Sequence, residues 1–130
     1  MILVDTTVWV DFFNNNNNEK VQILVDALKF NTDIFITDII LTEILQGIRD
    51  DKKYVIVKNT LLGLNFVHAK DFETYIHASD IYRECRKKGI TIRKTIDCLI
   101  AAIAIENDLT LLNNDKDFIN LAKCIDIKLL

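Results

Sequence analysis

The stretch Ile2-Leu3-Val4-Asp5-Thr6-Thr7-Val8-Trp9 sets the class of fold. Its apolar start is typical of a short buried strand, and a helical pattern follows from Thr6 to about Phe13. Asp5 stands at the junction between the two. Because ligands bind at the carboxyl ends of strands in a parallel α/β sheet, Asp5 is either a functional acid or the cap of the following helix.

The same alternation of strand and helix continues along the chain. Further strands are predicted at 34–36, 64–67, 109–112 and 125–129, and further helices at 20–30, 38–47, 52–62, 71–88 and 97–107. This order predicts an α/β fold with a parallel sheet and helices on both of its faces. The polar run Asn14 to Asn18 is predicted to be a mobile loop. Since no linker or repeat interrupts the pattern, we expect one domain over residues 1–130.

Composition excludes several classes of protein. The 130 residues are 50% apolar and carry 19 acids against 16 bases, a formal net charge of −3. The apolar fraction is too high for intrinsic disorder, and there is no basic excess of the kind that coats nucleic acid. Only three glycines are present, and none forms a phosphate-binding loop of the P-loop or dinucleotide type.

The cysteines and the N-terminal sequence indicate the cellular compartment. Cys85, Cys98 and Cys124 are too scattered for a disulfide framework and are expected to be buried thiols in a reducing cytoplasm. An acid at position 5 argues against a signal peptide, and the longest apolar run, 98–105, is too short to cross a membrane. We therefore expect a soluble, cytoplasmic protein without a membrane partner.

Four other acids have unusual neighbours. Glu43 lies in an apolar stretch, where it is either functional or a surface glutamate on a helix flank. Asp97 opens the most apolar helix, where the helix dipole favours a carboxylate in any case. Asp115 and Asp117 follow the strand at 109–112, where each also fits a turn or a helix cap.

Taken together, these acids predict a metal site. Acids that follow strands and acids on helices can converge at one edge of the sheet, where their mutual repulsion requires a cation. Oxygen-only ligands select hard ions such as Mg²⁺ or Mn²⁺, which activate water and bind phosphodiester oxygens. The residues therefore predict metal-dependent phosphoryl hydrolysis.

Four motifs, in their order and spacing, resemble one known family. They are Ile2-Leu3-Val4-Asp5-Thr6-Thr7-Val8-Trp9 and the segments 37–47, 95–102 and 111–118. In these motifs the chain resembles the PIN-domain ribonucleases, and specifically the VapC-like toxins of type II toxin–antitoxin pairs. The resemblance covers almost the whole chain and implies a single PIN domain with a sheet of about five parallel strands.

The resemblance also implies a set of site residues around one or two Mg²⁺ or Mn²⁺ ions. The family's pocket acids, which serve as metal ligands and catalytic groups, correspond to Asp5, Glu43, Asp97 and Asp115. Asp117 belongs to the same motif as Asp115, and which of the two faces the metal stays open. A hydroxyl near the first acid corresponds to Thr6 or Thr7. The family often carries Ser or Thr near position 113, where this chain has Asn.

The implied activity is endonucleolytic hydrolysis of single-stranded or loop RNA by a homodimer. A small antitoxin is implied as the second partner, and DNA is implied only indirectly, through that antitoxin. Aromatic residues of the first helix fit either the core or a docking surface for such a partner; they are Trp9, Phe12 and Phe13.

A basic segment precedes Asp97. Six cations fall within twelve residues: Arg83, Arg86, Lys87, Lys88, Arg93 and Lys94. They fit phosphate contacts beside the metal site, with Arg86 to Lys88, Arg93 and Lys94 as candidate RNA-binding residues. They equally fit a solvated helix end whose cations suit the negative end of the dipole. His68 and His77 are not expected to be ligands.

Other classes of function compete with this interpretation. A receiver-type phosphoacceptor regulator shares the size and the acidic pocket, but Thr6 and Thr7 stand where its second acid is needed. A dehalogenase-type phosphatase needs Asp at position 7. A third alternative keeps the PIN fold without catalysis, as a protein that binds RNA or regulates its operon together with the antitoxin.

Overall fold

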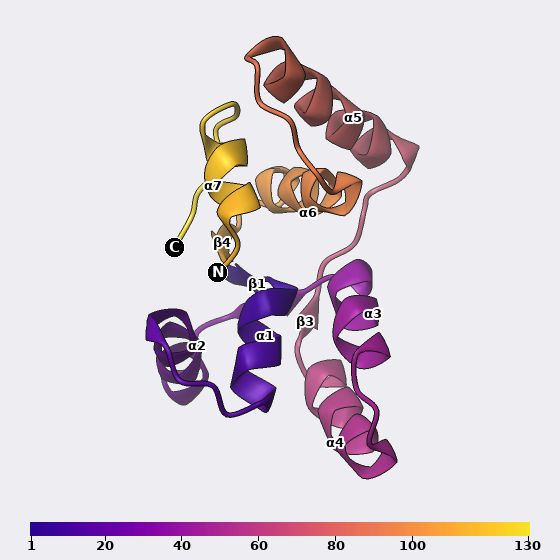
Figure 1. The fold of residues 1–130 in the computed structure, drawn as a ribbon. Helices are drawn as coiled ribbons and strands as arrows, with labels where there is room; N and C mark the ends of the chain where they lie inside the picture. The colour runs from indigo at the N-terminus through magenta and orange to yellow at the C-terminus, as the bar shows by residue number, and fades with distance from the viewer. The chain divides into compact units, whose positions relative to one another are not determined.

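The computed structural model describes residues 1–130 and contains seven helices and four strands (Figure 1). The chain divides into two compact units. The first contains residues 1–67 and 112–114, and the second contains residues 68–111 and 115–130. The predicted fold class, α/β with parallel strands flanked by helices, is confirmed.

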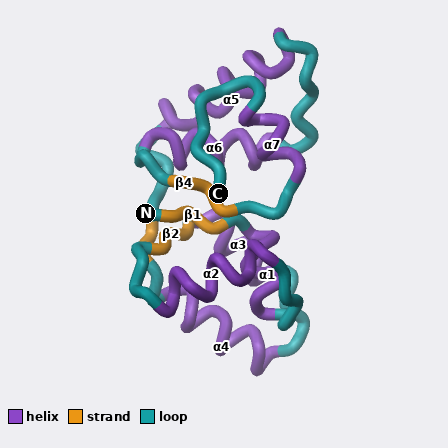
Figure 2. Tube along the Cα trace, turned by 90° about the vertical axis from the view of Figure 1, so that its left-hand side faces the viewer, coloured by secondary structure: helices purple, strands orange, loops and turns teal.

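Parallel strands form the centre of the first unit. Strand β1 (Ile2–Val4) pairs with β2 (Ile34–Ile36), which pairs with β3 (Asn65–Phe66). The first two lie side by side in Figure 2. Leu112, the last residue of β4 (Thr110–Leu112), also belongs to this unit, and its carbonyl accepts a 2.9 Å hydrogen bond from the N–H of Asp5. The chain therefore leaves β1 at Asp5 with its backbone held beside the end of β4.

Four helices follow the strands of this unit. They are α1 (Thr6–Phe13), α2 (Glu19–Lys29), α3 (Asp38–Gln46) and α4 (Asp51–Leu62). Each begins after a side chain that accepts a hydrogen bond from the first turn: Asp5, Asn18, Thr37 and Asp50. Such caps satisfy backbone N–H groups that have no partner within the helix. The sequence therefore fixes where each helix begins.

Trp9 settles part of the question about the aromatic residues of α1. Its side chain is fully buried, and its ring stacks on that of Phe13 with centroids 5.7 Å apart. Phe12 meets Trp9 edge-on at 5.9 Å and, like Phe13, is half-buried. Trp9 is thus a core residue, whereas the two phenylalanines extend this cluster towards the surface.

Helices dominate the second unit. Helix α5 (Phe72–Lys87) packs closely against α6 (Thr95–Glu106), and α6 also contacts α7 (Lys116–Ala122). The apolar sequence of α6 has its expected place, because all residues from Ile100 to Ala104 are buried. No side chain caps the start of α6, which follows Lys94 directly.

Two elements differ from the sequence prediction. Helix α7 was not expected, because its seven residues are too short for a clear helical period. The segment 125–129 was expected as a strand, but it contributes only a single parallel bridge between Leu111 and Leu129. The structure therefore has four strands where about five were expected, although the chain does run beside Leu111 at the predicted place.

The asparagine run between α1 and α2 has specific partners. Asn18 caps α2, and its amide donates to a carboxylate oxygen of Asp11 at 3.0 Å. Asn16 donates to the other oxygen of Asp11 at 3.4 Å, and Asn14 accepts from Lys53 Nζ at 2.8 Å. Two amides of this low-complexity run therefore contact Asp11, and a third contacts Lys53. Mobility of the loop stays a prediction.

The three cysteines are free and buried, as predicted. Burial raises the pKa of the Cys85 thiol to about 12 and that of Cys98 to about 11, so both thiols stay protonated at neutral pH. None of the helices combines the length and the apolar character that crossing a bilayer requires.

Gly89 lies two residues after the end of α5, and its backbone conformation yields the first prediction. Its φ is +77°, a left-handed conformation that an L side chain adopts at a cost of roughly 1–2 kcal/mol. We expect Gly89→Ala to lower the free energy of unfolding by about 1 kcal/mol, measured by chemical denaturation. Gly47→Ala is the matched control, because Gly47 has φ −83° and an added Cβ would make ordinary contacts. Equal effects of the two substitutions would contradict the prediction.

Candidate functional site

In the first unit, a chain of hydrogen bonds holds the carboxylate of Asp5. The Thr7 hydroxyl donates to Asp5 Oδ2 at 2.9 Å, and the Thr7 N–H reaches the same oxygen at 3.4 Å. The backbone N–H of Asn114 in turn donates to the Thr7 hydroxyl oxygen at 3.3 Å. The hydrogen bond from Asn114 therefore orients the Thr7 hydroxyl, so that its proton points at the carboxylate of Asp5. Asp5 is both the cap of α1 and a fixed acid beside the end of β4.

Glu43 joins the same unit from α3, which packs against α1. The hydroxyl of Thr6 donates to Glu43 Oε1 at 2.8 Å. Adjacent threonines at the start of α1 thus hold two different acids, Thr7 holding Asp5 and Thr6 holding Glu43. The structure therefore brings together Asp5, Thr6, Thr7 and Glu43, four of the residues that the sequence singled out.

The environment of Asp5 disfavours its charge. Burial raises the pKa of this carboxyl, because only 4% of the residue is exposed. Hydrogen bonds from the Thr7 hydroxyl and from the N–H groups of Thr6 and Thr7 oppose the shift, and the negative charge of Glu43 adds to it. A cation placed at Asp5 would remove this penalty.

In the second unit, three acids converge on one place. Asp97 lies in the first turn of α6, Asp115 caps α7, and Asp117 lies in the first turn of α7. Each of the three offers a carboxylate oxygen, and these oxygens lie within 4.8 Å of one another. Asp97 and Asp117 are 5% and 4% exposed, and Asp115 is half-buried. The structure thus places both acids of the 115–117 pair in the cluster, rather than one of them.

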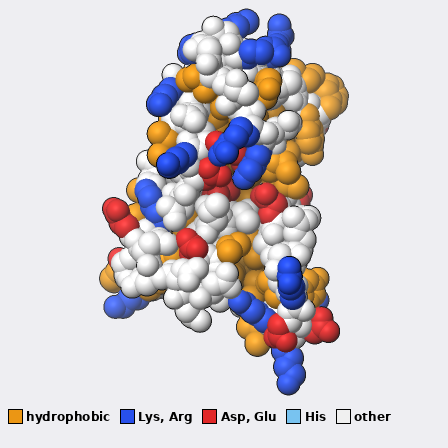
Figure 3. Space-filling model, viewed as in Figure 1, with side chains coloured by type: hydrophobic (Ala, Val, Ile, Leu, Met, Phe, Trp, Pro, Cys, Tyr) orange, Lys and Arg blue, Asp and Glu red, His pale blue; other side chains and the backbone are white.

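Two cations accompany these acids. Arg93 Nη2 lies 3.1 Å and Nε 3.3 Å from Asp117 Oδ1, and Lys94 Nζ lies 3.6 Å from Asp115 Oδ2. Figure 3 shows acidic side chains directly beside Lys and Arg side chains over the α6 and α7 part of the surface. Three carboxylates against two cations leave one formal negative charge in this cluster.

The donor set of the second unit fits a hard divalent ion. All three groups are carboxylates, and their spacing allows one ion to contact one oxygen of each. Asp117 Oδ2 is buried and has no hydrogen-bond partner, although its other oxygen accepts from Arg93. A buried anionic oxygen without a donor is costly unless a cation binds it. These residues are therefore suited to Mg²⁺ or Mn²⁺.

The other predicted RNA-binding cations lie elsewhere on this unit. Arg86 and Lys87 occupy the last turn of α5, and Lys88 ends that helix. Lys88 Nζ donates to the carbonyl of Cys124 at 2.7 Å, which fits a structural role. Arg86 lies over the ring of Tyr82, and both residues line an apolar groove of about 660 Å³ between α5 and α6. The basic segment of the sequence therefore divides into a helix end and a pair of cations at the acids.

Neither histidine lies in these acid clusters. His77 Nδ1 is 2.6 Å from Glu106 Oε2, an acid at the end of α6. His68 is exposed at the beginning of the second unit. The sequence expectation that neither serves as a ligand stays a prediction.

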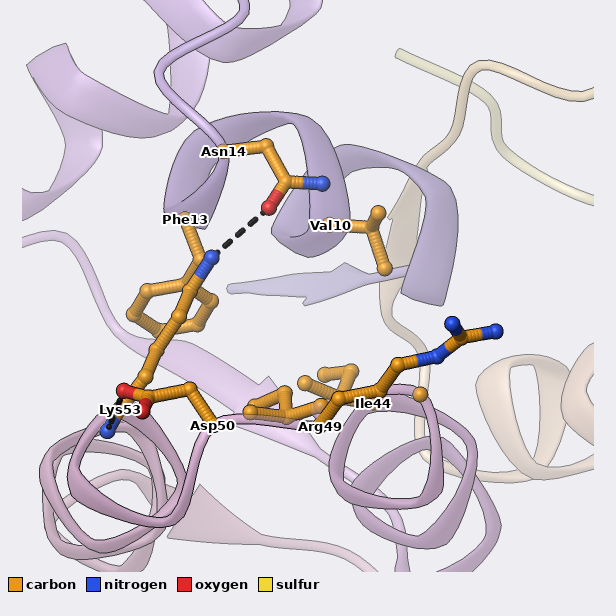
Figure 4. Close-up of a pocket in the computed structure, with 9 residues that line it drawn as sticks. Val10, Phe13, Asn14, Ile44, Arg49, Asp50 and Lys53 are labelled. Atoms are coloured by element: carbon orange, nitrogen blue, oxygen red, sulfur yellow. Dashed lines mark hydrogen bonds between the residues drawn. The ribbon is translucent and has the colours of Figure 1, made fainter.

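A hollow of about 330 Å³ also lies beside α1 and α3 in the first unit (Figure 4). Val10 and Phe13 of α1 face Ile44 of α3 across it, and Lys53 reaches over one end to Asn14. The hollow holds one acid, Asp50, which caps α4. It is therefore apolar in its middle and has no acid cluster of its own.

Asn114 is the one site residue that the sequence reasoning passed over. Its N–H orients Thr7, and its amide donates to Asp11 Oδ2 at 3.3 Å. The available signal was position, because Asn114 lies two residues after the end of β4 and one residue before the candidate acid Asp115. Asn113, where the resembling family often has Ser or Thr, is buried.

Comparison with known proteins adds to this geometry. A family model described as the PIN domain matches residues 2–123. Ribonuclease VapC11 of Mycobacterium tuberculosis is 31% identical over 129 residues, which are 98% of this chain and 96% of that protein. The VapC ribonuclease Mb1587 of Mycobacterium bovis matches with the same figures.

Solved structures agree in fold. VapBC2 from Rickettsia felis, bound to a DNA fragment from its promoter, matches with a TM-score of 0.79 at 22% identity, over 100% of this chain and 98% of that one. DNA-bound VapBC from Salmonella typhimurium matches with a TM-score of 0.78 at 21% identity, over 99% and 96%. From the family match and the curated relatives, the chain belongs to the PIN-domain family and, within it, to the VapC ribonucleases.

Proposed function

We propose that the chain is a Mg²⁺- or Mn²⁺-dependent endoribonuclease that acts as the toxin of a toxin–antitoxin pair. The observation that carries the proposal is the convergence of three carboxylates, from Asp97, Asp115 and Asp117, within 4.8 Å. In a chain that belongs to a nuclease family, such a cluster supports phosphodiester hydrolysis.

The proposal also assigns the acids. Within the first unit, Thr7 and Thr6 hold Asp5 and Glu43, and within the second unit Asp97, Asp115 and Asp117 converge. Asp5, Glu43, Asp97 and Asp115 are proposed as the metal-binding and catalytic acids, and Asp117 lies in the same cluster as Asp97 and Asp115.

The chain's own residues have separable tasks in this proposal. When bound, a divalent ion supplies positive charge for a water nucleophile and for the phosphate. Thr7 fixes the direction in which Asp5 presents its oxygens, and Asn114 fixes Thr7. Thr6 holds Glu43, so that this carboxylate is oriented before substrate arrives. Such oriented partners keep ligands in place and raise metal affinity.

Partners follow from the same relatives. The two solved structures compared above are VapBC complexes, and both are bound to DNA, which supports an antitoxin partner and contact with promoter DNA only through it. RNA as substrate is supported by the curated relatives, which are named ribonucleases. A homodimer and residence in the cytoplasm are part of the proposal, and the free thiols fit the latter.

The alternatives stand differently after the comparison. Membership of the PIN-domain family leaves no support for a receiver-type regulator or a dehalogenase-type phosphatase. A catalytically silent member that binds RNA or regulates its operon differs from the proposal in one property, the cleavage of RNA. The first experiment below therefore separates the two.

Asp5→Asn tests the proposed activity. We expect it to lower the rate of Mn²⁺-dependent RNA cleavage by about a hundredfold or more, because a fixed anionic ligand is lost. The measurement is cleavage of a labelled single-stranded RNA by the purified chain with Mn²⁺ and with excess chelator.

The matched control for this experiment is Asp26→Asn. Asp26 lies on α2, where it accepts a hydrogen bond from Gln22, and its loss should leave the rate unchanged. Cleavage that survives Asp5→Asn or chelator would contradict the mechanism. A wild type that cuts no RNA would favour the silent alternative.

Thr7→Val tests the orientation of Asp5. The substitution removes the hydroxyl at nearly constant shape, so Asp5 loses its 2.9 Å hydrogen bond. We expect the Mn²⁺ concentration for half-maximal activity to rise about tenfold. Thr7→Ser keeps the hydroxyl and should remain within about twofold of the wild type. If Ser and Val behave alike, the hydroxyl does not position Asp5.

The raised pKa of Asp5 predicts how stability depends on pH without metal. Between the ordinary value of 3.8 and the raised value, the folded state binds more protons than the unfolded state. The stabilisation that protonated Asp5 gives to the folded state is therefore complete below pH 3.8. It is lost as the pH rises through the pKa that Asp5 has in the folded state. We expect Asp5→Asn to remove this part of the pH dependence and to raise Tm at neutral pH in chelator.

Thermal unfolding across pH 4–8, with and without Mn²⁺, measures this effect. Saturating Mn²⁺ should reverse the order, because it stabilises the wild type more than the variant. A wild type that is more stable than Asp5→Asn at neutral pH in chelator would show that the burial of this charge is not a net cost.

A further inference from the structure

We propose that Arg93 and Lys94 are exchangeable counter-ions, which neutralise the acid cluster when metal is absent and move to RNA phosphates when metal is bound. The inference rests on the proposed metal-dependent ribonuclease function and deepens it. It assigns these two residues a task that the other cations of the basic segment do not share. All groups involved belong to the second unit.

The first support is the position of the two residues. They lie in the irregular segment just before α6, and Lys94 precedes the first residue of that helix without capping it. Both side chains contact acids at the start of α7: Arg93 pairs with Asp117, and Lys94 pairs with Asp115. Two cations therefore pair with two of the three carboxylates that a metal would use.

The second support is the contrast in exposure within each pair. The side chain of Arg93 is 72% exposed and that of Asp117 is 6% exposed. For Lys94 and Asp115 the values are 57% and 16%. The acids are fixed in the protein, whereas the cations reach them from solvent. Ion pairs with an exposed partner add little stability, so the cations can leave at small cost.

The third support is the geometry of the arginine contact. Both Nε and Nη2 of Arg93 point to the same oxygen, Asp117 Oδ1. The second oxygen, Oδ2, is buried without a hydrogen-bond partner. A parallel two-oxygen contact, the strong form of an arginine–carboxylate pair, is therefore absent here. The contact neutralises charge but leaves half of the carboxylate unsatisfied.

Charge then determines the exchange. A divalent ion among the three carboxylates competes with both cations for the same negative charge and repels them. Once displaced, the two long side chains remain tethered next to the metal, where a substrate phosphate carries the opposite charge. Arginine and lysine are the side chains that contact phosphate most often. The same cations thus serve the acids first and the substrate second.

The metal arm of the test measures Mn²⁺ binding by the electron paramagnetic resonance of free Mn²⁺. We expect Arg93→Gln to bind Mn²⁺ about fivefold more tightly, because a competing charge is removed. Arg93→Lys should return affinity towards the wild type. Arg86→Gln is the matched control and should leave the Mn²⁺ affinity unchanged, since Arg86 lies over the ring of Tyr82 and not at the acid cluster. Unchanged or weaker Mn²⁺ binding by Arg93→Gln overturns the inference.

The RNA arm uses Asp5→Asn as background, so that RNA is bound without being cut. With saturating Mn²⁺, adding Arg93→Gln should weaken RNA binding and reduce the slope of affinity against salt concentration by about one. In chelator the effect should be smaller, because Arg93 then pairs with Asp117. Equal effects with and without Mn²⁺, or none, overturn the exchange.

Lys94→Gln is a second variant in case Arg93→Gln does not fold. Its partner Asp115 still accepts from the N–H of Asp117, so the cap of α7 remains. The same changes, tighter Mn²⁺ and weaker RNA, are expected. Failure of the proposed function has a different signature, because the wild type would then bind no Mn²⁺ or cut no RNA. A wild type that does both, with variants that alter neither, refutes the inference alone.

Discussion

Carboxylates held close together away from water repel one another, and this repulsion constrains every other part of the site. Asp97 and Asp117 are buried within reach of Asp115 and of each other. The N–H of Asp117 donates to Asp115, and two surface cations reach in from solvent. These partners reduce the repulsion without removing it. Surplus negative charge therefore remains in the cluster, and in the proposed function a divalent cation neutralises it.

Helix starts make this arrangement possible. Asp5 caps α1, Asp115 caps α7, and Asp97 lies in the first turn of α6. The positive end of a helix dipole stabilises a carboxylate at each of these places. For Asp5 and Asp115, the sequence left capping and function as alternatives, but one position can serve both. A cap fixes the acid at the end of a strand, and the fixed acid is then available for a ligand.

How much of this the sequence could predict depends on whether a signal is local. Asp5 and Asp97 stood out as candidate site acids because each lies at a sharp change of sequence pattern, from strand to helix or into an apolar helix. Helix α7 could not be predicted, since its seven residues are too few for a clear helical period. The segment 125–129 alternates in hydrophobicity as a strand does, although only Leu129 forms a bridge. Residue type also could not show that Arg93 and Lys94 contact acids of the cluster whereas Arg86 to Lys88 do not. A left-handed turn at Gly89 lies between the two groups, and only the structure shows which cations meet acids.

The net charge of −3 is therefore a poor guide to a nucleic-acid partner. It averages over acids that differ in kind: solvated ones such as Asp108, whose exposed carboxylate pairs with Lys128, and buried ones such as Asp117. Three carboxylates and two cations leave one negative charge at the cluster, and a divalent ion changes the sign of that sum. In the proposed function, attraction of phosphate then depends on metal occupancy rather than on a permanent basic surface. Such a nuclease would need few cations, provided that they lie beside the acids.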